Sequence, residues 1–142
     1  MIRLFTMEDY DEVFQLWKST PGMGLRSLED SREGILRFMN RNPGTNFVAV
    51  ENGRILGAIL SGHDGRRGFL YHTCVKACHR RRSIGRELVE KVVEAMQQEG
   101  ILKLSLVCYS ENDLGNQFWE TLGWKRREEL YFYSLSIHEG EE

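Results

Sequence analysis

One stretch of the chain limits its possible folds more than any other, because a strand, a basic turn and an amphipathic helix follow in close succession. Phe69–Val75 reads as the strand and Arg80–Gly85 as the turn. Ile84–Gln98 carries apolar residues at helical spacing, with polar residues between them and Gly100 just past its end. A strand followed by a helix with one apolar side predicts a sheet covered by helices.

The chain before this stretch predicts a hairpin and a short first strand. Phe47–Val50 and Ile55–Leu60 are apolar runs on either side of Asn52-Gly53, a pair that tolerates positive φ at both central positions of a tight turn. Ile2–Phe5 is a further strand candidate.

Two helices are expected between the first strand and the hairpin. The first opens at Thr6, with Asp9 as its capping partner. Its apolar face consists of Tyr10, Val13, Phe14 and Trp17. The second opens near Ser27 or Asp30 and ends before Pro43. Its inward residues are expected to be Ile35, Leu36 and Met39.

The second half predicts further strands and one more helix. Leu102–Cys108 is a strand candidate, Asp113–Leu122 a helix, and Trp124–Arg127 and Leu130–Ile137 two closing strands. The expected order is therefore β-α-α-β-β-β-α-β-α-β-β. A hairpin-rich first half joined to a strand–helix–strand unit predicts a mixed sheet flanked by helices, in the α/β or α+β class.

Length and composition favour one domain over residues 1–142, with 138–142 as a frayed acidic tail. The 19 Lys and Arg residues nearly balance the 21 Asp and Glu residues, so the net charge of −2 gives no general reason to expect nucleic acid or a membrane as partner. No apolar run approaches the ~20 residues of a membrane span, and the N-terminus lacks a signal-peptide pattern. The odd set of cysteines, Cys74, Cys78 and Cys108, suits a reducing compartment, so we expect a cytoplasmic protein.

The basic turn has a composition that suits an anion. The first turn of a helix leaves backbone N–H groups unpaired and carries partial positive charge, and the consecutive guanidinium groups of Arg80, Arg81 and Arg82 add fork-shaped donors. A phosphate group of a cofactor is one interpretation. A solvated basic helix start is another, and a nucleic-acid patch is a third, although no basic stripe with interleaved aromatic residues extends from it.

Two motifs in this half resemble the conserved blocks of the GNAT (GCN-five-related) acetyltransferases, over roughly residues 46–135. The family patterns are Gln/Arg-x-x-Gly-x-Gly/Ala, which binds acetyl-CoA, and Asn-x-x-Ala-x-x-Phe-Tyr-x-x-x-Gly-Phe. The matching stretches here are Val75-x-x-x-x-Arg80-Arg81-Arg82-Ser83-Ile84-Gly85-Arg86-x-Leu88 and Asn112-x-x-Gly115-x-x-Phe118-Trp119-Glu120-x-Leu122-Gly123-Trp124.

The resemblance implies a small bacterial-type N-acetyltransferase with a mostly antiparallel mixed sheet and about four helices. Acetyl-CoA would be the co-substrate, without a metal, and the acceptor a primary amine of a small molecule or protein that attacks directly in a ternary complex. The pantetheine arm would pair with the strand before the turn, and an N–H near Val75 would polarise the thioester carbonyl. The implied cofactor-binding residues are Thr73, Cys74, Val75, Arg80, Arg81, Arg82, Ser83, Ile84, Gly85, Arg86, Asn112 and Trp119.

The sequence departs from the family pattern at Ser83, at Trp119, and at Arg81 and Ala77, where relatives often carry glycine and proline. Ser83 replaces the first glycine, and we expect it to compensate as a helix N-cap or by donating its hydroxyl to phosphate. Trp119 stands where relatives carry a tyrosine that protonates the leaving thiolate, so water or Tyr109 is expected to supply that proton. These departures also leave open a catalytically silent acyl-CoA-binding or regulatory module.

The catalytic base is expected on the strand before the turn. The resemblance places it four or six residues before Val75, at Tyr71 or Phe69, and Phe69 cannot act. Tyr71 is therefore the candidate for orienting a water or relaying the proton, and a residue of the pocket wall is the other interpretation. Strand alternation would put Tyr71 and His72 on opposite faces, with His72 directed at a helix. His72 is the alternative, because an ordinary histidine pKa near 6.5 suits a base. Asn112 is interpreted either as a helix cap alone or as a pantetheine contact too.

Three further interpretations concern ligands and partners. A zinc site built on Cys74, Cys78, His79 and Cys108 is disfavoured, because no paired Cys-x-x-Cys motif exists. The acceptor pocket is expected between the Ser19–Arg26 loop, the turn near Asp64 and the closing hairpin, with no acceptor class favoured. Leu130–Ile137 could pair across the edge of a homodimer.

Overall fold

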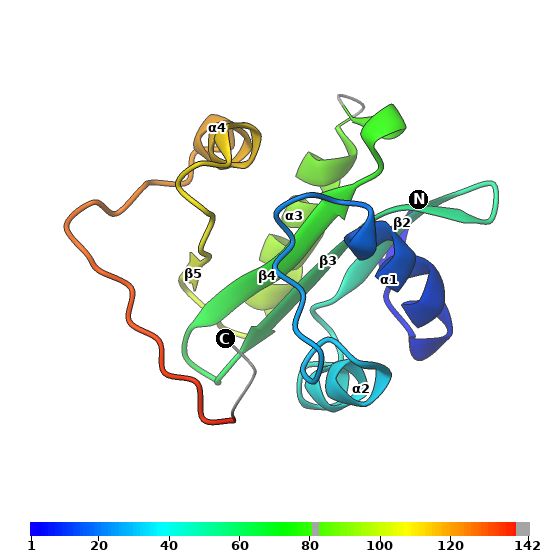
Figure 1. The fold of residues 1–142 in the computed structure, drawn as a ribbon, viewed down its shortest axis with the longest axis horizontal. Helices are drawn as coiled ribbons and strands as arrows, with labels where there is room; N and C mark the ends of the chain where they lie inside the picture. The colour runs from blue at the N-terminus through cyan, green and yellow to red at the C-terminus, as the bar shows by residue number, and fades with distance from the viewer. Residues whose placement is uncertain (81–82, 139–142) are drawn as a thin grey trace.

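The computed structural model describes residues 1–80 and 83–138, and its elements follow the expected order as far as the last helix (Figure 1). They are β1 (Ile2–Leu4), η1 (Met7–Asp9), α1 (Tyr10–Lys18), α2 (Arg32–Arg41), β2 (Phe47–Glu51), β3 (Arg54–His63), β4 (Gly68–Val75), η2 (Ala77–His79), α3 (Ile84–Gln98), β5 (Leu104–Ser105) and α4 (Asp113–Thr121). Within those two ranges, every helix is too short or too polar to serve as a membrane span.

The strands form one five-stranded sheet in the order β1-β2-β3-β4-β5. All neighbours are antiparallel except β4 and β5, which are parallel. Helices α1 and α2 cover one face of the sheet and α3 covers the other, while α4 lies beyond β5 (Figure 1). The mixed, mostly antiparallel sheet predicted from the sequence is confirmed.

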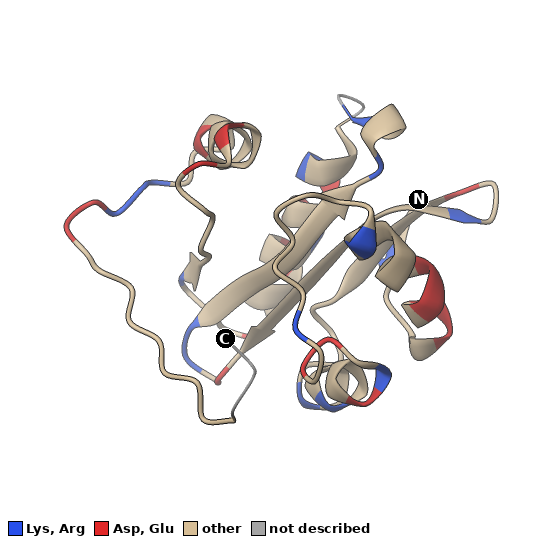
Figure 2. Ribbon diagram, viewed as in Figure 1, with Lys and Arg blue, Asp and Glu red and all other residues tan. Residues whose placement is uncertain are grey.

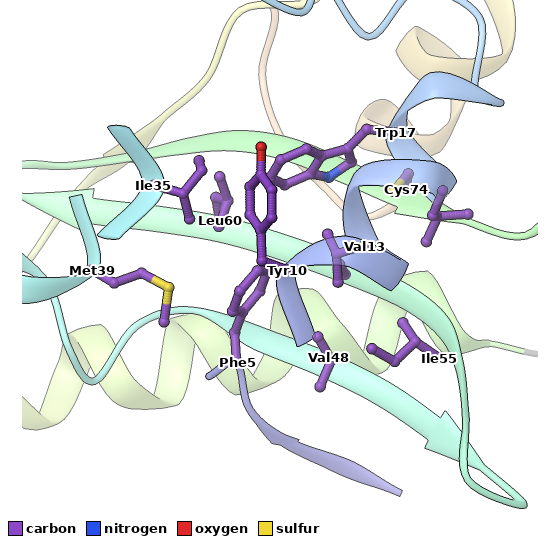
Figure 3. Close-up of a cluster of buried hydrophobic side chains, with 12 residues drawn as sticks. Phe5, Tyr10, Val13, Trp17, Ile35, Met39, Val48, Ile55, Leu60 and Cys74 are labelled. Atoms are coloured by element: carbon purple, nitrogen blue, oxygen red, sulfur yellow. The ribbon is translucent and has the colours of Figure 1, made fainter. Parts of the chain in front are cut away.

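A separate hydrophobic core fills each side of the sheet. On the α1–α2 side, Figure 3 shows side chains of both helices directed at the strands, with Trp17 and Val13 fully buried. On the other side, Leu88, Val92 and Met96 of α3 are buried against β2, β3 and β4. Burial of this kind is worth about 1.5–3 kcal/mol for each large apolar side chain, so the two cores fix the sheet between its helices.

Local signals set the helix starts and the hairpin turn. The Asp9 carboxylate accepts the Thr6 N–H at 2.9 Å, as the capping pair predicted. Asn52 and Gly53 both have positive φ, 52° and 74°, which confirms the hairpin. Helix α2 opens later than expected, because Ser31 is its cap and accepts the Gly34 N–H at 3.1 Å.

One residue of α2 was assigned to the wrong face. Ile35 and Met39 are buried as expected, but Leu36 is exposed. Residues four apart on a helix lie on one stripe, whereas a neighbour in sequence is rotated by about 100°. The Ile35–Met39 stripe joins the core that α1 and the strands share, which leaves Leu36 on the outer side of α2.

The predicted closing strands are absent from the described part of the chain. Helix α4 is followed by extended chain without ladder pairing, which Figure 1 shows running away from the sheet. The strand expected at Leu102–Cys108 is likewise reduced to Leu104–Ser105. The residues of the Leu130–Ile137 segment are all exposed. Strand propensity needs a long enough edge to pair with, and β5 is too short to supply one.

Candidate functional site

Strand β4 has one edge that the sheet leaves largely open. β5 pairs with it only through Gly68 and Phe69, next to the turn that joins β3 to β4. Over the described residues, no strand pairs with the remainder of this edge, from Leu70 to Val75. The opposite edge pairs with β3 along the length of β4. The end of β4 that leads towards α3 is therefore accessible to an extended ligand.

The register decides which backbone groups face the open edge. Lys76 donates its N–H to the Leu56 carbonyl oxygen at 2.7 Å, so groups at even positions in this part of the strand face β3. The backbone groups of Thr73 and Val75 therefore point to the open edge, because donors and acceptors alternate between the two neighbours of a strand. Cys74 faces β3, and burial raises the pKa of its thiol to about 12. Of the three strand residues expected to bind pantetheine, Thr73 and Val75 have the required direction.

A β-bulge interrupts β4 in the middle of this region. The pairing register shifts between Ile59 and Ser61 of β3, where Tyr71 and His72 together stand opposite Leu60. An extra residue of this kind changes the direction of the side chains beyond it, and such bulges are common next to functional sites. The bulge is thus the point at which β4 stops following regular alternation.

The bulge overturns the expected facing of Tyr71, whereas His72 is directed at a helix, as predicted. The Tyr71 ring lies 5.5 Å from that of Phe38 on α2, and the His72 ring lies 4.9 Å from that of Trp17 on α1. Both side chains therefore lie on the α1–α2 side of the sheet, not on opposite faces. Burial raises the pKa of the Tyr71 phenol, and the nearby Glu29 carboxylate raises it further. The phenol therefore stays protonated at neutral pH, which does not suit a base.

His72 has a partner that the sequence did not indicate. Its Nε2 lies 2.7 Å from Oδ1 of Asp30, which is only 4% exposed. The other carboxylate oxygen of Asp30 accepts the backbone N–H of Arg26 at 2.7 Å, and Tyr10 donates its hydroxyl to the Asp30 carbonyl oxygen at 2.6 Å. Asp30 was expected only as a possible helix start. No local pattern connects two positions 42 residues apart.

The turn before α3 is basic and contains a strained residue. Arg80 follows η2, and Figure 2 shows Lys and Arg segments flanking the start of α3. Arg81 and Arg82 lie outside the described residues. Ser83 has φ 65° and ψ 12°, a left-handed conformation that favours glycine, and its side chain makes no capping hydrogen bond. Ser83 occupies the N-cap position and accepts the Glu87 N–H through its carbonyl oxygen at 3.0 Å, but the expected capping bond from its side chain is not formed. A contact of its hydroxyl with phosphate stays a prediction. Ile84 begins the helix and is buried.

The next two motif residues face α4. A Cβ atom on Gly85 would lie 3.0 Å from a ring carbon of Phe118, so glycine permits the close approach of α4 to α3. Arg86 lines a surface hollow of about 530 Å³ between these helices, together with Val89 and Leu122. This hollow borders two helices and does not include the open edge of β4.

The residues of the second motif cap α4 and supply its packing contacts. The Asn112 side chain accepts the Gly115 N–H at 2.9 Å, which makes it the N-cap of α4. The Trp119 ring lies 4.9 Å from that of Phe118 and 5.1 Å from that of Trp124. Trp119 is therefore part of an aromatic cluster on the inner side of α4. Capping and packing account for both residues without a ligand.

One predicted wall of the acceptor pocket lies near the open edge. The loop after α1 passes close to the segment after β5: a Cβ on Gly24 would lie 3.3 Å from the Tyr109 hydroxyl oxygen, and a Cβ on Gly22 would lie 4.0 Å from Asn112 Nδ2. The turn near Asp64, by contrast, lies at the opposite end of β4 from Val75. The closing hairpin expected as a third wall is not formed.

Comparison with known proteins identifies the architecture. The family model described as Acetyltransferase (GNAT) family matches residues 8–124. An acetyltransferase of Sodalis glossinidius is 28% identical over 141 residues, which cover 99% of this chain and 98% of that protein.

Two solved structures are similar in fold. The PaiA N-acetyltransferase of Thermoplasma acidophilum, solved with coenzyme A, has a TM-score of 0.75 and 22% identity, covering 88% of this chain and 89% of the other. An aminoglycoside acetyltransferase from an uncultured soil metagenomic sample, solved with sisomicin, has a TM-score of 0.78 and 16% identity, covering 97% and 96%. The open edge of β4, the turn into α3 and the family match agree, and the chain belongs to the GNAT family of acetyltransferases.

Proposed function

We propose that this protein transfers an acetyl group from acetyl-CoA to a primary amine of a small molecule or protein, by direct attack in a ternary complex. The observation that carries the proposal is the unpaired edge of β4 from Leu70 to Val75, which leads through a basic turn into the first turn of α3. An extended chain with amide groups can pair with such an edge, and a diphosphate suits a helix N-terminus.

The residues of the site fit the two ends of that co-substrate. Thr73 and Val75 offer backbone donors and acceptors to the pantetheine amides, spaced as in a strand pair. The N–H groups that open α3, together with Arg80, face the position proposed for the diphosphate. A left-handed residue such as Ser83 is common in turns whose successive N–H groups bind anions, which supports a diphosphate at this position.

The chemistry needs a polarised carbonyl and a route for protons. We assign the first task to the Val75 N–H, which points to the open edge and is worth about 10²–10³ in kcat if it serves as an oxyanion donor. The leaving thiolate needs little help, since a thiol pKa of about 8.5 makes it stable near neutral pH. Water or the Tyr109 hydroxyl returns its proton, because the Trp119 indole cannot act as an acid of comparable strength.

The Val75 assignment can be tested with a pair of matched variants. Val75→Pro removes the N–H, whereas Val75→Ala keeps it, and both variants lose the branched methyl groups of valine. Proline is tolerated at an edge position whose N–H does not pair with a strand. We expect a kcat for Val75→Pro about 10²–10³-fold below that of Val75→Ala, at similar thermal stability. Equal turnover in the two variants would contradict the assignment.

Calorimetry and an amine panel test the function itself. Heat of binding with acetyl-CoA, and products of the expected mass from an aminoglycoside, a polyamine, an amino acid or a peptide N-terminus, would support it. The panel includes aminoglycosides because a structural neighbour is an aminoglycoside acetyltransferase. Binding without any product would favour a silent acyl-CoA-binding module, and no binding at millimolar acetyl-CoA would refute both.

A further inference from the structure

We propose that His72 is the general base of this acetyl transfer and that Asp30 is the positioning residue that holds its imidazole ring. The inference rests on the proposed function and adds to it the group that removes the proton from the acceptor amine. It replaces Tyr71, the residue expected from the sequence.

The His72 ring is held from two sides. Oδ1 of Asp30 lies 2.7 Å from Nε2, and the Trp17 indole packs against the ring at 4.9 Å with an interplanar angle of 70°. Trp17 is fully buried and Asp30 is 4% exposed, so neither partner can move away without disturbing the core. An imidazole fixed by a buried carboxylate and a buried aromatic ring has one orientation available to it.

The contact with Asp30 also selects a tautomer. The carboxylate already accepts the Arg26 backbone N–H through its other oxygen, and an ionised carboxylate can only accept hydrogen bonds. Nε2 of His72 must therefore carry the hydrogen. The lone pair that can receive a proton is then on Nδ1, the arrangement that a general base needs.

His72 lies at the correct part of β4 for this task. It is in the bulge, where pairing with β5 has ended, and it precedes Val75 by about 10 Å of strand at ~3.3 Å per residue. Its side chain is 17% exposed, so water can reach it although its partners are buried. Ordered water between Nδ1 and the acceptor nitrogen would carry the proton over this separation.

The proposed reaction releases one proton for each protonated amine that is acetylated. A protonated amine gives one proton through water to Nδ1 of His72, and the neutral nitrogen bonds to the acetyl carbon while the carbon–sulfur bond breaks. The nitrogen loses a second proton, which the departing thiolate takes up to give the thiol. His72 then returns its proton to solvent, so that amide, free CoA and one proton are the products.

Other titratable groups lie near the His72 ring. They are Asp30 and Glu29 on the loop before α2, Tyr10 on α1, and Tyr71 and Cys74 on β4. Burial raises the pKa of Tyr10, Tyr71 and Cys74, which keeps these three groups neutral over the working range of a histidine.

The kinetic test compares His72→Gln and Asp30→Asn with a matched control, His63→Gln. His63 also contacts a carboxylate, with Nε2 2.5 Å from Glu99 Oε1, but at the end of β3 next to α3. We expect His72→Gln to lower kcat/KM by about 10²–10⁴-fold and to remove the inflection of the pH–rate profile. Asp30→Asn should lower kcat/KM less and shift that inflection, while acetyl-CoA affinity is kept in all variants and His63→Gln retains wild-type kinetics.

A spectroscopic readout tests the geometry without turnover. In protein with ¹⁵N-labelled histidine, which contains four such residues, the His72 signals are those lost in His72→Gln. Two-bond ¹H–¹⁵N spectra should show the neutral ring protonated at Nε2 in the wild type, and a mixture of tautomers in Asp30→Asn.

The outcomes are distinguishable. A wild-type ring protonated at Nδ1, or a His72→Gln variant that keeps the wild-type pH profile, overturns the inference and leaves the proposed function intact. No product from the wild-type protein with any amine of the panel overturns both.

Discussion

Replacing Gly85 by alanine tests how closely α4 packs on the first turn of α3. A Cβ atom built on Gly85 meets two ring carbons of Phe118, at 3.0 and 3.1 Å, and a methyl group of Val75 at 3.7 Å. Ordinary contacts between carbon atoms lie near 3.5–4.0 Å. The ring must therefore retreat by roughly half an ångström, and α4 must move with it, because Phe118 also packs against Trp119.

The change in the free energy of unfolding expected for Gly85→Ala is the sum of two opposing contributions. Overfilling a packed contact costs typically about 1–3 kcal/mol. Alanine is favoured over glycine by about 1 kcal/mol inside a helix, and by less here, because Gly85 is the second residue of α3. We therefore expect Gly85→Ala to lower the free energy of unfolding by about 1 kcal/mol.

A double-mutant cycle with Phe118→Leu separates these contributions. Leucine removes the ring that the new methyl group meets, so the overfilling cost should disappear while the helix preference remains. We expect a coupling energy of about 1–2 kcal/mol between the two positions, measured by urea unfolding with tryptophan fluorescence. If Gly85→Ala stabilises the wild-type background, or if the two changes are additive, the close packing of α3 and α4 is not real.

Three further predictions use single positions. Ser83→Gly should raise the free energy of unfolding by up to about 1 kcal/mol in urea titrations, since it relieves a left-handed serine; a loss of stability would contradict the strain. The pKa of Asp9 is held below its ordinary value, first by hydrogen bonds from the Arg3 guanidinium. The stability that ionised Asp9 contributes is therefore present above the ordinary pKa of about 4 and is lost as pH falls through the lower pKa of the folded state. The free energies of unfolding of wild type and Asp9→Asn should differ at pH 7 and converge in acid. A difference that stays constant with pH would count against the ion pair. Iodoacetamide at pH 8 should modify exposed Cys78 and spare buried Cys74, whose thiol pKa is raised to about 12; equal labelling by mass spectrometry would disprove that burial.

Local rules were sufficient for much of the fold. Asn52-Gly53 predicts the hairpin because the turn requires positive φ at both residues, and few other residue pairs adopt positive φ at both positions. Helix α3 has the predicted bounds, because its apolar stripes are long and a glycine follows them. In each case the information lies within one turn or one helix face.

The parts that failed depend on partners distant in the chain. No residue near Tyr71 signals a bulge, which exists only in the register of β4 against β3. Strand alternation therefore gave Tyr71 the wrong face, although His72 is directed at a helix as predicted. The contact of His72 with Asp30 has the same origin, since the loop before α2 folds over β4 from 42 positions away. The edge proposed for pantetheine was indicated by a motif, whereas the proposed base required tertiary structure.

The exposed Leu130–Ile137 segment has a consequence for handling the protein. A β-prone stretch that pairs with no strand of the described residues is a template for identical copies, which would stack at a spacing of about 4.8 Å. The run before it, Lys125-Arg126-Arg127-Glu128-Glu129, places charges where an in-register stack would bring like against like at every layer. We expect these charges to oppose fibre growth, as charged residues beside apolar strands commonly do. A shortened form of the chain should therefore omit the charged run and Leu130–Ile137 together, because removing the charges alone would leave the aggregation-prone stretch without neighbouring charges.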